Sequence, residues 1–222
     1  MKELNRYFDH TNLKPEATSD DIRKLCGQAK TYQFYAVCVN SSYVRLAAKE
    51  LAGSSIKIVA VTGFPLGACS TEVKAYEADD ALRRGADEID MVMHIGALKE
   101  KRYDYVKSDI AAVVSIAREY DAVVKVIIET SLLTKEEIVK SCELAREAGA
   151  DFVKTSTGFS GGAAAPEEVK LMKDTIGDVM KVKASGGIRA LNTALAMIAA
   201  GADRLGASAS MEIFDEFNHE KG

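Results

Sequence analysis

The stretch AREAGADFVKTSTG, from Ala145 to Gly158, runs from the end of a helical pattern through a Gly-Ala-Asp turn into a short apolar strand. The same Gly-Ala-Asp turn recurs at Gly85 and Gly201, and each time it joins a helical pattern to a strand pattern. A strand and helix that alternate as a repeated unit indicate a parallel sheet covered by helices.

Short runs rich in valine and isoleucine are predicted as strands along the whole chain. They are RYFDHT (6–11), FYAVCVN (34–40), IKIVAVTGF (56–64), EIDMVMHIG (88–96), VVKVIIET (123–130), DFVKTSTG (151–158), VMKVKASGG (179–187) and DRLGASA (203–209). Eight units in 222 residues leave about 28 residues each, enough for a strand, a helix and two short loops. The sequence therefore predicts an α/β protein, with residues 1–222 forming a single (β/α)8 TIM barrel domain. A doubly wound open sheet is the alternative, because strand alternation alone does not show closure.

Composition excludes several classes of protein. The formal net charge of −4 gives no basic surface for nucleic acid, and no apolar run approaches the ~18 residues of a membrane span. The opening MKELNRYFDHTNLKPE is too polar for a signal peptide. The four cysteines are far apart and lack the spacing of a zinc site or a disulfide framework. We expect a cytoplasmic protein with neither nucleic acid nor a membrane as partner.

Polar residues share the inner face of the predicted barrel. Alternate residues of a strand point to the same side, so an inward Lys154 fixes which residues of the other strands point inward. The interior then holds three carboxylates and three lysines: Asp9, Asp90, Glu129, Lys125, Lys154 and Lys183. Thr11 and Cys38 take inward positions on the first two strands. A structural ion-pair network would explain one such pair, whereas six ionisable groups near strand ends favour an active site.

Two of these lysines suggest covalent chemistry. A lysine attacks a carbonyl only as the free amine, and its ordinary pKa of ~10.4 leaves almost none free at neutral pH. Burial of Lys154 beside the charge of Lys183 would lower the pKa of Lys154 and activate it. Asp90 and Lys183 would then serve as acid and base.

Glycine-rich loops follow the last two strands, where many barrels hold a phosphate. KASGGIR (183–189) offers Gly186, Gly187 and Arg189, and GAS (206–208) offers Gly206 and Ser208. The polar stretch after Lys154 adds Thr155 and Gly158 as further candidates for binding the substrate or its phosphate. GFPLG (63–67) is interpreted as a structural turn.

The chain resembles the 2-deoxyribose-5-phosphate aldolases, a class I aldolase family, over nearly its whole length. The motifs are DHTNLKPEAT, AVCVN, GFPLGA, EIDMVMHIGALK, VKVIIETSLLT, DFVKTSTGF, VKASGGIR and RLGASA. The resemblance implies that Lys154 forms the Schiff base, that Asp90 and Lys183 relay protons, and that glycine loops hold the phosphate.

The implied reaction is the reversible cleavage of 2-deoxyribose 5-phosphate to glyceraldehyde 3-phosphate and acetaldehyde, without a metal or organic cofactor. Sugar phosphate and acetaldehyde would be the small-molecule partners, and a homo-oligomer, dimer or tetramer, is expected. Two other hypotheses remain: a pyridoxal-phosphate enzyme, which also needs a lysine beside a phosphate site, and a sugar-phosphate-binding barrel without activity.

Two departures from the family pattern stand out. His94 occupies a position where the family usually has asparagine, and we expect it to be a satisfied polar residue at the barrel mouth. The tail MEIFDEFNHEKG lacks the terminal tyrosine that some members use to close over the substrate.

Overall fold

The predicted alternation of strands and helices closes into a parallel barrel in the computed structural model, which describes residues 3–221. Strand β1 pairs with β2 on one side and with β8 on the other, so the sheet has no free edge and the open-sheet alternative is excluded. The strands are β1 (Phe8–Asn12), β2 (Ala36–Val39), β3 (Lys57–Thr62), β4 (Glu88–Val92), β5 (Val123–Ile127), β6 (Phe152–Lys154), β7 (Lys181–Ser185) and β8 (Arg204–Ala207).

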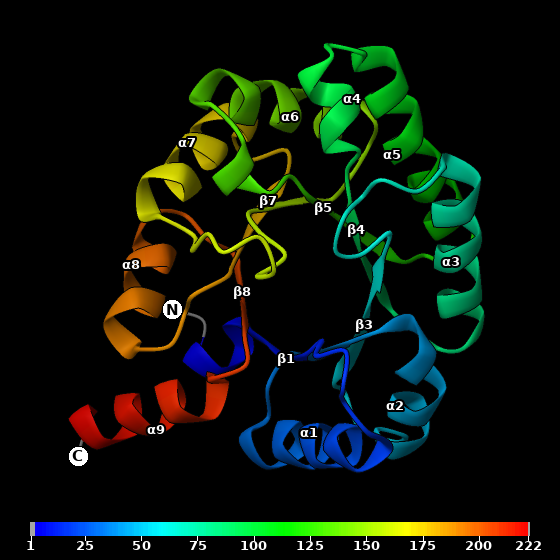
Figure 1. Ribbon diagram of the computed structural model, residues 1–222. Helices are drawn as coiled ribbons and strands as arrows, with labels where there is room; N and C mark the ends of the chain where they lie inside the picture. The colour runs from blue at the N-terminus through cyan, green and yellow to red at the C-terminus, as the bar shows by residue number, and fades with distance from the viewer. Residues whose placement is uncertain (1–2, 222) are drawn as a thin grey trace.

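Helices form a ring outside the strands (Figure 1). They are α1 (Ser19–Tyr32), α2 (Val44–Glu50), α3 (Thr71–Arg83), α4 (Ile95–Lys99), α5 (Tyr103–Arg118), α6 (Lys135–Glu147), α7 (Pro166–Ile176), α8 (Leu191–Ala199) and α9 (Ser210–Lys221). Short 3-10 helices are η1 (Leu4–Tyr7), η2 (Ser41–Tyr43) and η3 (Thr130–Leu132). The main apolar core lies between this ring and the outer face of the barrel, which leaves the inner face free for polar groups.

The repeated Gly-Ala-Asp turn joins helix to strand in the same way three times. Each glycine has a positive φ, 108° at Gly85, 81° at Gly149 and 108° at Gly201, which an L side chain rarely adopts. Each aspartate then accepts a hydrogen bond from a backbone N–H of the preceding strand. The pairs are Asp87 with Ile58 at 2.9 Å, Asp151 with Val124 at 2.8 Å and Asp203 with Val182 at 2.9 Å. The motif therefore ends a helix and ties the next strand to its neighbour.

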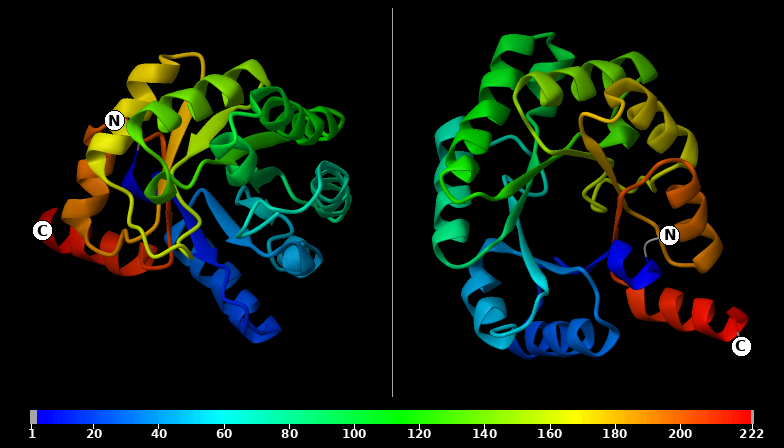
Figure 2. Two further views of the ribbon diagram at one scale, coloured as in Figure 1. Left: turned by 45° about the horizontal axis from the view of Figure 1, so that its top comes forward. Right: turned by 180° about the vertical axis from the view of Figure 1, so that it is seen from behind.

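The two ends of the chain differ most from the prediction. Tyr7 belongs to η1, so the first strand starts at Phe8 rather than Arg6. The C-terminal tail forms α9, which lies beside η1 (Figure 2). Residues 1, 2 and 222, which the predicted domain includes, lie outside the described residues. Within residues 3–221, no helix has the length and apolar character needed to span a membrane.

The GFPLG loop after β3 is tightly packed. A Cβ at Gly67 would lie 2.2 Å from the carbonyl oxygen of Met93, so only glycine fits there. The Gly63 N–H donates to Glu77 at 2.9 Å. These contacts agree with the interpretation of the loop as a structural turn.

Candidate active site

The barrel register brings the predicted lysines and aspartates together. Asp90 on β4 is the direct partner of Lys125 on β5, and Lys154 on β6 is the direct partner of Lys183 on β7. All four side chains are buried. The two residues of each pair lie side by side on neighbouring strands, and the charged ends of all four side chains meet inside the barrel.

Asp90 is the centre of the ion contacts. Its Oδ2 lies 2.8 Å from Nζ of Lys154 and 2.8 Å from Nζ of Lys183, and its Oδ1 lies 2.7 Å from Nζ of Lys125. Asp9 pairs with Lys183 and, at 2.9 Å, with Arg204. One carboxylate thus contacts both lysines of the proposed pair, as acid–base work at Lys154 requires.

The two lysines have opposite electrostatic environments. Burial lowers the pKa of Lys154, and the charge of Lys183 lowers it further against the opposing effect of Asp90. Burial would also lower the pKa of Lys183, but the carboxylates of Asp9 and Asp90 outweigh it and raise that pKa well above its ordinary value. Lys154 is therefore suited to be a neutral nucleophile and Lys183 to remain a cation.

The aspartates stay ionised for the same reason. Burial alone would raise the pKa of Asp90, but Lys125, Lys154 and Lys183 outweigh it and hold that pKa well below its ordinary value. Burial likewise opposes ionisation of Asp9, where Lys183 and Arg204 lower the pKa to about 2. Because both pKa values are low, each carboxylate can hold a proton only transiently during a reaction.

A cleft of about 530 Å³ opens at the carboxyl ends of β1, β6, β7 and β8, and Lys154 lies in its wall. The predicted residues that line it are Thr11, Lys154, Gly158, Gly186, Gly187, Arg189, Gly206 and Ser208. The structure thus gathers most of the predicted binding residues around one opening that leads to Lys154.

The glycines of this cleft have distinct steric roles. Gly186 and Gly187 have φ of 91° and 73°, and a Cβ at Gly187 would lie 2.6 Å from that of Ala163. A Cβ at Gly206 would lie 3.1 Å from Cε of Lys183, so this glycine also makes room for the lysine side chain. The first N–H of α8, at Leu191, donates to Glu216 at 3.1 Å. Anion donors at this end of the cleft therefore come from the loop before α8.

Three predicted residues lie elsewhere. Glu129, expected to face the lysines, instead accepts hydrogen bonds from the N–H of Thr157 at 3.1 Å and from its hydroxyl. The prediction was wrong because β5 ends at Ile127 and Glu129 has a left-handed conformation with φ 58°, so strand alternation no longer applies. Thr155 Oγ1 bridges to the backbone of Ser185 at 2.9 Å in both directions, and the residue is fully buried outside the cleft.

Cys38 is also fully buried and lies outside the cleft wall. Burial raises the pKa of its thiol, although Lys183 and Lys154 act in the opposite direction. This environment favours the neutral thiol, which packs in a buried apolar cluster with Leu13, Ala36, Val59 and Val61.

Two charged residues of the interior were missed by the sequence analysis. Glu88 Oε2 lies 2.6 Å from Nζ of Lys125, and Arg204 contacts Asp9 and, at 3.7 Å, Glu88. Glu88 shares the alternation of Asp90, and Arg204 that of Gly206, so extending the inward pattern two residues toward the amino end of each strand would have found them.

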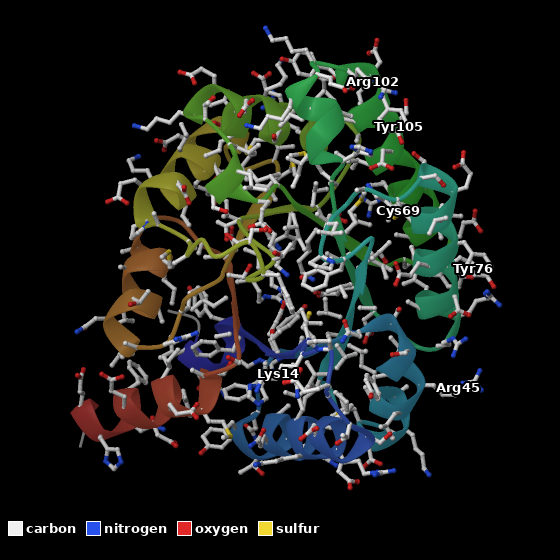
Figure 3. All side chains as sticks on the ribbon, viewed as in Figure 1. Lys14, Arg45, Cys69, Tyr76, Arg102 and Tyr105 are labelled. Carbon is white, nitrogen blue, oxygen red and sulfur yellow. The ribbon has the colours of Figure 1, made fainter. Side chains whose placement is uncertain are left out.

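Residues of α1, of α9 and of the loop between β1 and α1 complete the wall of the cleft. Lys14 follows β1, Lys24 and Gln28 lie on α1, and Glu212 lies on α9. Figure 3 shows Lys14 close to β1 on the side facing α1. Helix residues of this kind give no signal in the strand pattern, because only the packing of α1 and α9 brings them to the cleft.

His94 caps a helix at the barrel mouth. Its Nδ1 accepts a hydrogen bond from the Ala97 N–H at 3.1 Å, and its ring meets the Tyr105 ring edge-on with centroids 5.5 Å apart. The guanidinium carbon of Arg102 lies 4.6 Å from the centroid of the same Tyr105 ring, and Figure 3 shows the two residues side by side. The imidazole therefore performs the N-cap role that an asparagine side chain can also perform.

The chain is similar to known proteins over nearly its whole length. A deoxyribose-phosphate aldolase of Clostridium novyi is 59% identical over 212 residues, covering 96% of this chain and 95% of its own. The solved aldolase QR15 has a TM-score of 0.94 at 42% identity, covering 100% of this chain and 98% of its own. The tetrameric deoxyribose phosphate aldolase of Aeropyrum pernix has a TM-score of 0.91 at 35% identity, covering 97% of this chain and 91% of its own.

A closed barrel with two buried lysines paired on neighbouring strands fits the class I aldolases. A family model described as DeoC/LacD family aldolase matches residues 4–216. The chain belongs to this family.

Proposed function

We propose that this aldolase cleaves 2-deoxyribose 5-phosphate reversibly to glyceraldehyde 3-phosphate and acetaldehyde, with Lys154 as the Schiff-base residue. The observation that carries the proposal is the buried amine of Lys154, with a lowered pKa, at the wall of a cleft lined by glycine loops. The similarity to relatives named deoxyribose-phosphate aldolase supports the choice of substrate.

In the proposed reaction the neutral amine of Lys154 adds to the C1 aldehyde carbon. Loss of water with uptake of one proton, which is returned at the final hydrolysis, gives a protonated imine. Removal of the proton from the C3 hydroxyl then breaks the C2–C3 bond. The electron pair of that bond moves into the imine, which becomes an enamine, and glyceraldehyde 3-phosphate leaves.

Protonation of the enamine at its terminal carbon gives the imine of acetaldehyde, and water releases acetaldehyde with the free lysine. Asp90 and Lys183 carry these protons, because Asp90 Oδ2 contacts both lysines at 2.8 Å. Lys183 remains a cation through its contacts with Asp9 and Asp90 and can supply the proton that the enamine takes up.

The phosphate is held at the far end of the cleft from Lys154. Loop N–H groups near Gly186 and Gly187 act with Ser208, and Arg189 supplies the positive charge. The chain also assembles as a homo-oligomer, dimer or tetramer, which the tetrameric relative from Aeropyrum pernix supports.

The test combines cleavage of deoxyribose 5-phosphate, followed by a coupled assay for glyceraldehyde 3-phosphate, with cyanoborohydride reduction in the presence of acetaldehyde. We expect turnover and one reduced two-carbon adduct on Lys154 by peptide mass spectrometry. An adduct on another lysine would refute the role of Lys154. Ligand-induced stabilisation without turnover would support the binding-protein alternative, and visible absorbance of the active protein would support pyridoxal phosphate.

A further inference from the structure

The interior of the barrel holds two layers of charge. Lys154 is the last residue of β6, at the carboxyl end where the cleft opens. Glu88 and Arg204 are the first residues of β4 and β8, at the opposite end of their strands. Both are buried, with 3% and 5% of their surfaces exposed, and both lie outside the wall of the cleft. A substrate bound at Lys154 therefore does not touch them.

The two layers are connected by ion contacts. From Glu88 the contacts pass through Lys125 to Asp90, at 2.6 and 2.7 Å. From Arg204 they pass through Asp9 and Lys183 to the same Asp90 oxygen that contacts Lys154. A change of charge at Glu88 or Arg204 therefore alters the electrostatic potential at Lys154, because the charges lie in a solvent-excluded region where screening is weak.

The cluster carries unequal numbers of the two charges. Among the described residues, its ion contacts join three carboxylates, Asp9, Glu88 and Asp90, to four cations, Lys125, Lys154, Lys183 and Arg204. Cys38 also acts on Lys154, and its buried thiol favours the neutral form. If Lys154 loses its proton, the cluster balances at three charges of each sign.

Arg204 is the cation that cannot relieve this imbalance. Its guanidinium carbon lies 3.4 Å from the centroid of the Tyr35 ring, and its Nη1 donates to Asp9 at 2.9 Å. A guanidinium does not deprotonate in proteins, so its charge is permanent. The proton that leaves most readily must come from a lysine, and Lys125 and Lys183 each contact two or more carboxylates within 4.0 Å.

We infer that Glu88 and Arg204 are positioning residues for the reaction, a buried pair of opposite charges that together set how readily Lys154 gives up its proton. The inference rests on the proposed role of Lys154. It predicts that neutralising Glu88 and neutralising Arg204 shift the pKa of Lys154 in opposite directions, although neither residue contacts the substrate. At an effective dielectric constant of ~20, a unit charge roughly 12 to 24 Å away changes a pKa by roughly 1 to 0.5 unit.

The experiment measures the pH dependence of imine trapping with acetaldehyde and cyanoborohydride, read as the rate of adduct formation on Lys154. Acetaldehyde carries no phosphate, so the acid limb of the profile belongs to the protein. We expect Glu88→Gln to move that limb to lower pH by roughly 0.5 to 1 unit, and Arg204→Gln to move it to higher pH by a similar amount. Arg204→Lys keeps the charge and should leave the limb in place.

Asp109→Asn is the matched control, because Asp109 forms a buried ion pair with Lys74 at 2.5 Å, outside the barrel interior. It should destabilise the fold without moving the limb. Limbs of Glu88→Gln and Arg204→Gln that stay at the wild-type pH, or move in the same direction, would overturn the inference. Should Arg204→Gln be too unstable to assay, the shift of Glu88→Gln decides alone. Failure of the wild-type protein to form the adduct would refute the proposed function first, which keeps the two failures distinct.

Discussion

The molecule contains two buried groups of opposite charges, and they differ in balance. Lys74 on α3 and Asp109 on α5 form an isolated pair, 2.5 Å apart with both side chains fully buried, and Thr71 donates a further hydrogen bond to Asp109 at 2.8 Å. The barrel interior instead joins three carboxylates to four cations. The isolated pair is neutral as a whole and holds two helices together. The barrel cluster carries a surplus that makes one lysine a weaker base, so imbalance rather than burial distinguishes the reactive group.

The largest expected effect comes from removing the proposed reactive amine, that of Lys154. Lys154→Ala should lower kcat by at least about 10⁴-fold, because the other lysines of the cleft wall, Lys14 and Lys24, are exposed and lack the burial that lowers the pKa of Lys154. The coupled cleavage assay and the trapping experiment measure this loss. Substantial residual turnover with an adduct at another lysine would show that Lys154 is not the amine that forms the imine.

Removal of the second lysine should have the next largest effect. Lys183→Leu should lower kcat by about 10²- to 10³-fold, because it removes a proton donor and the charge that lowers the pKa of Lys154. The acid limb of the rate profile should also move to higher pH.

Lys183→Arg is the control for the charge alone. Its guanidinium keeps the positive charge and cannot transfer its proton, so kcat should fall while the acid limb stays near its wild-type position. Full activity of Lys183→Leu would contradict the proposal that Lys183 lowers the pKa of Lys154 and donates a proton.

The isolated pair should affect stability and leave chemistry unchanged. Asp109→Asn removes the charge that compensates buried Lys74, and we expect the free energy of unfolding to fall by about 3 kcal/mol. Urea unfolding at neutral pH measures the loss, and the activity profile of the folded variant should match the wild type. A shift in the profile would show that the two charged groups are coupled.

The smallest expected effect is the acid dependence of stability from the barrel cluster. The pKa of Asp9 is about 2 in the folded protein, below its ordinary value of 3.8, so Asp9 stabilises the fold above pH 4. This contribution, about 2 kcal/mol, is lost as the pH falls from 4 through 2. Unfolding by urea at pH 5 and at pH 2.5 measures it. A free energy of unfolding that does not fall over this range would contradict the pairing of Asp9 with Lys183 and Arg204.

Much of the fold and five of the seven charged residues of the barrel cluster could be predicted from residue patterns. Strand alternation put Asp9, Asp90, Lys125 and Lys183 on the inner face, and the structure confirms their burial there. The pattern failed at Glu129, because the strand had ended and the backbone had turned. The analysis also missed Glu88 and Arg204, although both lie inside predicted strands and share the alternation of Asp90 and Gly206.

By itself the sequence determined the repeated strand–helix unit, the inward lysines and the glycine loops, because these depend on local periodicity and on backbone conformations that few residues adopt. Only the tertiary structure decided closure of the barrel, the entry of α1 and α9 into the cleft wall, and the ion contacts that hold Lys183 charged while leaving Lys154 the weaker base. The physical reason is that a pKa depends on distances between charges far apart in the chain, which strand pairing and register fix together.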